Sequence, residues 1–263
     1  MPLERGILFE DQMRRLRFYE REHPYTEHVR GFLLTPAGTD FHTLTREFPD
    51  RWSLYLVGGV PRDLLLERQR GVSIPLADVD VVVDGAETVD ELRNALGPFA
   101  MRENHFGGLK CRVRERAPVF DVWRAQDHIN VGGGHERIGI ERLLRHFLID
   151  VDAVALETRT MRLFDLGCTA ALEIGRIDML GDAGVSPAFA ALQGAHVLLV
   201  QRKTGFSLSP RLCRFVAEVC AGVGVAAVMD LVERKHPAAA EGIRASLRQI
   251  AAGDGALAAK VGL

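Results

Sequence analysis

The stretch at residues 54–84 constrains the fold of this chain more than any other. It begins with a short apolar strand that ends at Gly58 and Gly59, and the next segment, with a proline in its first turn, predicts a helix. The segment Asp-Val-Asp-Val-Val-Val-Asp that begins at Asp78 predicts a β-branched strand. Since strand side chains alternate between two faces, Asp78 and Asp80 are expected on one face, and Val79, Val81 and Val83 on the other.

Both halves of this stretch indicate phosphate and metal chemistry. Adjacent glycines let the backbone approach an anion closely, and a helix N-terminus offers unpaired N–H groups and the positive end of a dipole. Two carboxylates held side by side repel each other, and a hard divalent cation relieves that repulsion. Gly58 and Gly59 are therefore candidates for binding phosphate, and Asp78 and Asp80 are candidates for binding metal.

A third carboxylate, Asp121, lies within a predicted strand between two apolar residues. A charge in mid-strand costs free energy unless that face of the strand lines a cleft. We therefore expect Asp121 to join Asp78 and Asp80 in one site. Taken singly, the Gly-Gly turn favours a structural turn and the acidic pair favours a solvated surface, but their combination favours a site.

Contact with RNA would have to come from local basic patches, because 33 Lys and Arg residues against 35 Asp and Glu give a net charge of −2. Two patches are predicted. One is a strand with alternating basic residues at 110–116, in which a tight hairpin would put Arg114 opposite Asp121. The other lies within residues 183–217, which contain no acidic residue. The alternative for each patch is a solvated surface. The candidate RNA-binding residues are Lys110, Arg112, Arg114, Arg202, Lys203, Arg211 and Arg214.

The rest of the chain predicts three parts: a helical extension at 1–50, a mixed domain at 51–168 and a helical domain at 169–263. The apolar spacing predicts helices at 8–22, which Pro24 would end, and at 41–48. Further helices are expected at 88–96 and 140–146, a glycine-rich loop at 131–135, a hairpin at 153–165 and helices from 171 onward.

The composition indicates a cytoplasmic protein without a membrane partner. The N-terminus has no charged-then-apolar signal pattern, and no apolar run approaches the length that spans a bilayer. The four cysteines show no spacing typical of a metal site, so we expect them to be reduced thiols.

Several motifs resemble those of one known family. Gly-Gly-Val-Pro-Arg-Asp at 58–63, followed by Asp78-x-Asp80, resembles the head-domain signature of the tRNA nucleotidyltransferase (CCA-adding enzyme) and bacterial poly(A) polymerase family. Residues 144–150 resemble its Arg-Arg-Asp-Phe-Thr-Ile-Asn motif, and residues 204–210 resemble the Leu-Gly-Phe-x-Ile-x-Pro element of its neck. The resemblance spans about residues 54–210 and is most specific in its first part.

This resemblance implies an α+β fold: a DNA polymerase β-like nucleotidyltransferase head with a mixed sheet, followed by a small helical neck. It also implies metal-dependent transfer of a nucleotide from an NTP, such as ATP, to a hydroxyl acceptor, with release of pyrophosphate. Asp78, Asp80 and Asp121 would be catalytic and would hold two Mg²⁺ ions, for which Mn²⁺ is a substitute. The implied nucleotide-binding residues are Gly58, Gly59, Arg62, Asp63, Arg145 and Asp150.

The sequence also departs from the family's pattern. Where the family carries charged residues that read the base, this chain has an uncharged stretch with Ala190, Gln193 and His196. Strict selection of cytosine and then adenine is therefore not expected. The favoured acceptor is an RNA (tRNA) 3′ end, as in tRNA processing. Two alternatives stay open: the same chemistry on a protein or small molecule, as in a toxin or defence enzyme, and a non-catalytic nucleotide-binding module.

Overall fold

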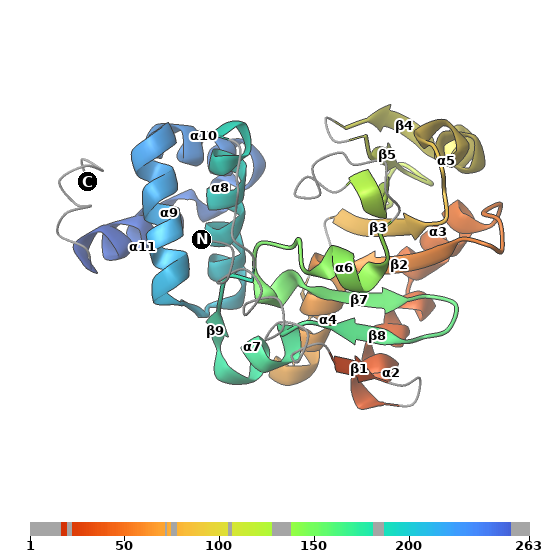
Figure 1. Cartoon of the computed structure of the whole chain (residues 1–263), viewed down its shortest axis with the longest axis horizontal. Coiled ribbons are helices and arrows are strands. Elements are labelled where there is room, and N and C mark those ends of the chain that lie inside the picture. The colour runs from red at the N-terminus through yellow and green to blue at the C-terminus, as the bar shows by residue number, and fades with distance from the viewer. Residues whose placement is uncertain are drawn as a thin grey trace, which may run out of the picture. The chain divides into compact units, whose positions relative to one another are not determined.

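The computed structural model describes residues 17–19, 23–71, 73–74, 78–104, 107–127, 138–180 and 187–253. The chain divides into two compact units, Met1–Ala170 and Ala171–Leu263. The first unit contains an eight-stranded sheet with helices, and the second is almost entirely helical (Figure 1).

The sheet of the first unit is mixed. Its strands lie in the order β1-β8-β7-β2-β3-β6-β5-β4, and β2, β3, β7 and β8 are seen side by side in Figure 1. Among the described strands, β3 and β6 pair in parallel and the other neighbours pair antiparallel. The strands are β1 (Arg17–Tyr19), β2 (Ser53–Val57), β3 (Asp78–Asp84), β4 (Ala100–Glu103), β5 (Leu109–Cys111), β6 (Val119–Arg124), β7 (Val154–Glu157) and β8 (Leu163–Asp165).

Helices cover the apolar face of this sheet. Val79, Val81 and Val83 of β3 are fully buried, and the ring of Phe41 on α3 lies 6.5 Å from that of Phe120 on β6, so α3 packs on the face opposite the acidic side chains. Helix α4 contacts β2, β3 and β7. The helices of this unit are α2 (Pro24–Gly31), α3 (Pro36–Thr45), α4 (Gly59–Arg70), α5 (Val89–Leu96) and α6 (Ile140–Leu144).

The second unit is a helical bundle that follows α7 (Cys168–Ile174), the helix at the boundary between the units. Helix α8 contacts the three helices that follow it, and a Cβ at its Gly194 would lie 3.0 Å from Val219 on α9. The elements are β9 (Arg176–Ile177), α8 (Pro187–Thr204), β10 (Ser207–Leu208), α9 (Pro210–Val223), α10 (Val225–Lys235) and α11 (Ala240–Gly253).

Within the described ranges, no single helix is long and apolar enough to cross a membrane. Helices α9 and α10 pass that test only as a pair, and they are bent by 102° at the break between them.

The predicted N-terminal elements differ from the structure. Residues 17–19, expected at the end of a helix, form β1, because they pair antiparallel with the edge strand β8. Pro24 begins α2 instead of ending a helix, since proline is well accommodated in the first turn. The second helix runs over Pro36–Thr45 rather than 41–48. Residues 8–16 and 20–22 of the predicted helix and the glycine loop at 131–135 lie outside the described residues.

Candidate active site

The three predicted carboxylates lie on one face of the sheet. Asp80 on β3 is directly opposite Asp121 on the parallel strand β6, and Asp78 lies two residues before Asp80 on the same face. Asp78 is exposed, and Asp80 and Asp121 are half-buried, whereas the neighbouring Val79 and Phe120 on the other face are fully buried. The structure therefore brings together the carboxylates that lie 43 positions apart in the sequence (78 to 121).

These carboxylates repel one another. The pKa of Asp80 is raised from 3.8 to about 7, first by burial and then by the nearby charges of Asp121 and Asp78, while Lys110 works in the opposite direction. A carboxyl group with such a pKa is half-protonated near neutral pH. The raised pKa reflects the crowding of carboxylates at the site, which a bound cation would relieve.

Asp121 is held by two side chains of the neighbouring hairpin. The Nζ atom of Lys110 donates to its Oδ2 at 2.9 Å, and the amide of Asn104 donates to its Oδ1 at 2.9 Å. Asn104 is oriented in turn by the backbone N–H of Gly108, which donates to its Oδ1 at 3.0 Å. The sequence interpretation missed Asn104. The signal in the sequence was Gly107, three residues later, because a glycine there indicates a turn; in the structure Gly107 lies between β4 and β5 with a φ of 80°.

The expectation that Arg114 lies opposite Asp121 is wrong. Strand β5 ends at Cys111, and its register puts Lys110 opposite Asp121. Residues 112–116 form bends and turns, so the predicted strand with basic residues on one face does not exist. Arg114 instead forms a bidentate ion pair with Asp40 within the first unit: its Nε donates to Oδ1 at 2.9 Å and its Nη2 donates to Oδ2 at 2.8 Å.

The donor chemistry of the three carboxylates fits a hard divalent cation, because all the available ligands are oxygens. Their arrangement is not a finished metal site: over the described part of the chain, no group of three or more His, Cys, Asp or Glu side chains is placed to hold a metal ion. Both oxygens of Asp121 accept hydrogen bonds, one from Lys110 and one from Asn104. Asp78 and Asp80 would be the first ligands, and Asp121 would follow once it leaves Lys110.

The Gly58–Gly59 turn lies beside these carboxylates. Leu56 pairs with Val81, so the last residue of β2 lies next to Asp80 and the turn follows immediately. Gly58 has φ 62° and ψ −115°, a conformation that other residues rarely adopt, and α4 begins at Gly59. A Cβ at Gly58 would lie only 3.5 Å from the Phe147 ring. The N-terminal N–H groups of the twelve-residue helix α4 therefore lie on the side of the sheet where Asp80 is found.

Arg62 and Asp63 lie in the interior. The Nε of Arg62 donates to Asp63 at 2.9 Å, and its Nη1 donates to Asp152; the three side chains are 3–5% exposed. Burial works to lower the pKa of Arg62, but the carboxylates of Asp152 and Asp63 outweigh it and raise the pKa. Arg62 thus fixes α4 to the segment before β7 instead of facing solvent. Asp152, which the sequence interpretation did not single out, completes this network.

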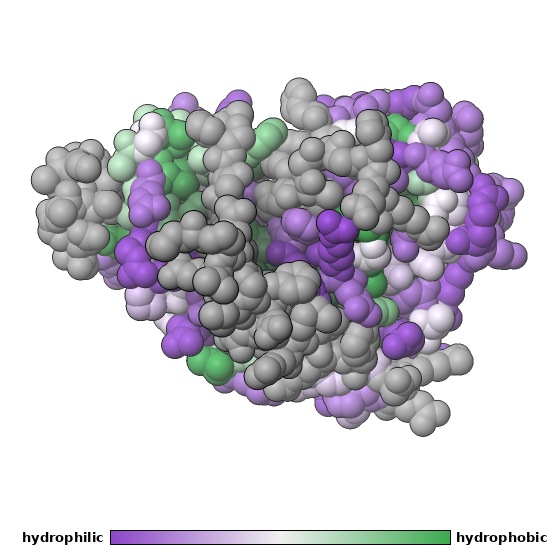
Figure 2. Space-filling model, viewed as in Figure 1, coloured by the Kyte–Doolittle hydropathy of each residue, from purple (hydrophilic) through white to green (hydrophobic). Residues whose placement is uncertain are grey.

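The remaining predicted site residues are spread over both units. Arg145 caps the C-terminal end of α6 and is half-buried, and the Asp150 side chain accepts a hydrogen bond from the next backbone N–H, at 2.8 Å. In the second unit, Arg202 and Lys203 lie exposed at the end of α8, Arg214 is exposed on α9 and Arg211 is half-buried. In the first unit, Figure 2 shows hydrophilic residues around α5 and β4, at the end of the sheet where Arg102 and Glu103 are exposed.

The fold resembles that of known enzymes. Over 88% of its length the chain matches a Thermotoga maritima CCA-adding enzyme complexed with tRNA-CCA, with a TM-score of 0.60 and 17% sequence identity. A CCA-adding enzyme in an apo form matches with a TM-score of 0.60 and 18% identity over 89% of the chain, and one in complex with ATP with 0.58 and 17% over 88%. The chain spans about half of these proteins, 54–55% of their length.

No protein-family model matches the chain, and no curated protein matches it by sequence. The structural matches confirm the predicted fold, a nucleotidyltransferase-type mixed sheet followed by helices. In fold, this chain resembles the CCA-adding enzymes over most of its own length and about half of theirs.

Proposed function

We propose that this chain is a metal-dependent nucleotidyltransferase. A hydroxyl group of the acceptor attacks the α-phosphorus of an NTP, a new P–O bond forms, the bond to the β-phosphate breaks, and pyrophosphate leaves. The observation that carries this proposal is the position of Asp80, opposite Asp121 on parallel strands and beside a Gly-Gly turn that opens α4. The match in fold to CCA-adding enzymes, including complexes with ATP and CTP, supports it.

Each group has a separate role in this proposal. The backbone N–H groups at Gly58 and Gly59 bind the triphosphate, and the positive end of α4 favours its charge. Asp78, Asp80 and Asp121 hold the divalent ions, which polarise the α-phosphate and lower the pKa of the acceptor hydroxyl when they are bound. Asp121 orients that hydroxyl and accepts its proton as the new P–O bond forms, once Lys110 has moved aside. Lys110 is then free to pair with a phosphate oxygen.

The buried Arg62 is a positioning residue here and not a direct triphosphate contact. Its guanidinium lies 3.5 Å from the place that a Cβ at Gly59 would take, and it ties the start of α4 to Asp152. Arg145 and Asp150 remain proposed nucleotide contacts, and the domain division at residues 1–50, 51–168 and 169–263 remains a proposal as well.

The proposed acceptor is an RNA 3′ end. The match to a CCA-adding enzyme complexed with tRNA-CCA supports it, as do the exposed basic residues Arg202, Lys203 and Arg214 on the helical unit. Selection among NTPs is proposed to be less strict than cytosine followed by adenine. On α8, Ala190 and Gln193 are buried and bear no charge, so they offer no ionised group to a base edge.

The test combines labelled ATP, CTP, GTP and UTP with Mg²⁺, the purified chain, and either total RNA or total protein. Label appearing on RNA, and its loss in the Asp121→Asn variant, is the expected result. Asp90→Asn is the control, because this carboxylate on α5 is exposed and lies outside the cluster. Label on protein alone would replace the RNA acceptor with a protein hydroxyl, and no label under any of these conditions would refute the proposed transfer.

A further inference from the structure

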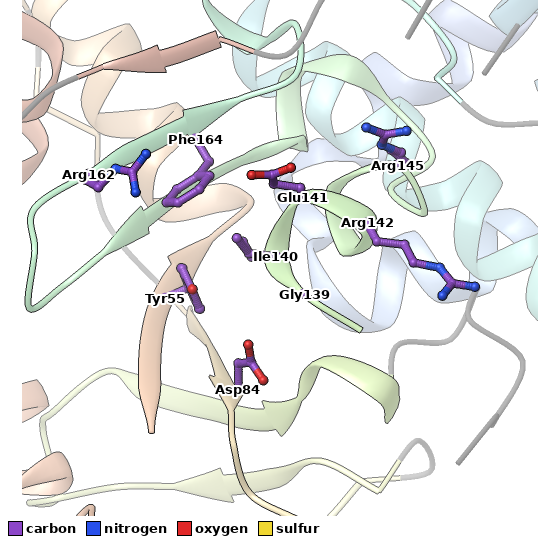
Figure 3. A pocket seen from close by; sticks show the side chains of 9 residues that line it. All are labelled: Tyr55, Asp84, Gly139, Ile140, Glu141, Arg142, Arg145, Arg162 and Phe164. Atoms are coloured by element: carbon purple, nitrogen blue, oxygen red, sulfur yellow. The ribbon is translucent and has the colours of Figure 1, made fainter. Parts of the chain in front are cut away.

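A pocket of about 580 Å³ opens in the first unit, and Arg145, of the motif at 144–150, is one of its lining residues (Figure 3). Its walls come from β2, β3, β8 and the segment around α6. Two aromatic rings form part of the wall: Tyr55 and Phe164 meet edge to face, with 5.9 Å between their centroids. This volume is in the range of pockets that hold one small organic group, such as a nucleotide.

The pocket lies on the same face of the sheet as the candidate catalytic carboxylates. Tyr55 pairs with Val82, and Ser53 pairs with Asp84, the lining residue at the end of β3. Asp84 and Asp80 share a strand face, since they are separated by an even number of residues. At about 3.3 Å per residue, Asp84 lies roughly 13 Å along β3 from Asp80. A short single strand that ends at the carboxylates would reach the pocket.

The charged lining suits a nucleotide. Arg162 lies over the ring of Phe164, with its guanidinium carbon 5.4 Å from the ring centroid, and Figure 3 shows the two side chains together on one side of the pocket. A guanidinium plane held over an aromatic ring is a surface on which bases stack. Arg142 and Arg162 are exposed, so either can meet a phosphate at the pocket's rim.

Acidic residues complete the lining. Asp84 and Glu141 reach the pocket from β3 and α6. Carboxylates accept hydrogen bonds from ribose hydroxyls and from exocyclic amino groups, which an RNA strand offers and a simple anion does not. The lining thus has three arginines, Arg142, Arg145 and Arg162, and two carboxylates. Such a lining fits a group with one phosphate and several hydrogen-bond donors better than the highly charged triphosphate of an NTP.

We propose that this pocket binds a nucleotide of the acceptor RNA that lies upstream of the reacting 3′ hydroxyl. The inference rests on the proposed transfer to RNA. The triphosphate of the incoming NTP is proposed to bind elsewhere, because the Gly58–Gly59 turn and the start of α4 lie at the other end of β2 from Ser53. The nucleotide that Arg145 contacts is then the acceptor nucleotide in the pocket and not the NTP. The pocket then favours acceptors long enough to fill it.

The test measures RNA binding apart from catalysis. A fluorescein-labelled RNA decamer is titrated with the full chain in EDTA and without NTP, and its anisotropy gives the Kd. The Arg162→Glu variant should raise this Kd by roughly tenfold, since one stacked base contributes about 1–3 kcal/mol. Arg46→Glu is the matched control, because Arg46 is exposed at the end of α3, which packs on the opposite face of the sheet. An unchanged Kd for Arg162→Glu overturns the proposal, whether or not transfer is detected.

Kinetics separate the pocket from the proposed function. With a dinucleotide acceptor, too short to fill the pocket, Arg162→Glu should leave the KM unchanged, and with the decamer it should raise the KM by a similar factor of about ten. The KM for the NTP should not change. A decamer that the wild-type chain uses no better than the dinucleotide also overturns the pocket's role. Absence of transfer to both acceptors, with the decamer still bound through Arg162, refutes the proposed function and leaves the RNA pocket supported.

Discussion

Replacing Asp80 with asparagine should stabilise the metal-free protein, although it removes a candidate catalytic residue. The pKa of Asp80 is raised to about 7 from 3.8, first by burial and then by Asp121 and Asp78. A rise of about three pKa units corresponds to about 4 kcal/mol, because each unit is worth about 1.4 kcal/mol. That is the cost of ionising Asp80 in the folded state, and Asp80→Asn avoids it at nearly the same volume.

The sign of the pH dependence follows from the direction of the shift. Because the folded state holds the proton of Asp80 more tightly than the unfolded state, the wild-type chain loses stability as the pH rises from 3.8 to about 7. The Asp80→Asn variant lacks this loss. The difference in unfolding free energy between the two should therefore be under about 1 kcal/mol at pH 4 and reach up to about 4 kcal/mol at pH 8.5.

Urea denaturation in EDTA at these two pH values measures the difference directly. Asp90→Asn, with a side chain 81% exposed, serves as control and should change the unfolding free energy by no more than about 0.5 kcal/mol. Added Mg²⁺ should stabilise the wild-type chain and not Asp80→Asn, since binding to the folded state alone raises its stability. If Asp80→Asn is no more stable than wild type at pH 8.5, the carboxylates are not crowded and the reasoning fails.

Four further predictions concern the same elements. Arg62→Ala should lower the unfolding free energy by about 3–5 kcal/mol in urea denaturation, because it removes the buried cation that lies between the carboxylates of Asp63 and Asp152; a loss below about 1 kcal/mol would contradict the buried network. Gly58→Ala should cost about 1–2 kcal/mol by the same assay, since its φ of 62° strains a residue with a Cβ; equal stability would show that the turn relaxes. Lys110→Ala should tighten Mg²⁺ binding in calorimetry, because Asp121 loses its competing cation; unchanged or weaker binding would argue against that competition. Arg211→Glu with Arg214→Glu should raise the KM for RNA and spare the KM for NTP, and an unchanged RNA KM would favour an acceptor other than RNA.

The part of the site that the sequence alone determined is local. The strand, the Gly58–Gly59 turn, the helix after it and the shared face of Asp78 and Asp80 follow from a period of two, a glycine pair and a proline in a first helical turn, all within about thirty residues. The structure has each of them at β2, α4 and β3. Such signals act over a few residues, and tertiary contacts did not override them.

Only the tertiary structure decided which side chains meet these elements. Strand β5 ends at Cys111 and pairs Lys110 with Asp121, whereas a longer strand with a register four residues different would put Arg114 there; the sequence pattern alone allows either. Arg62 is buried because Asp152, 90 residues away, reaches it, and residues 17–19 become a strand because β8 offers them an edge. Pairing register, buried ion pairs and edge strands depend on which distant segments come together. A local sequence pattern therefore does not determine the free energy of these contacts.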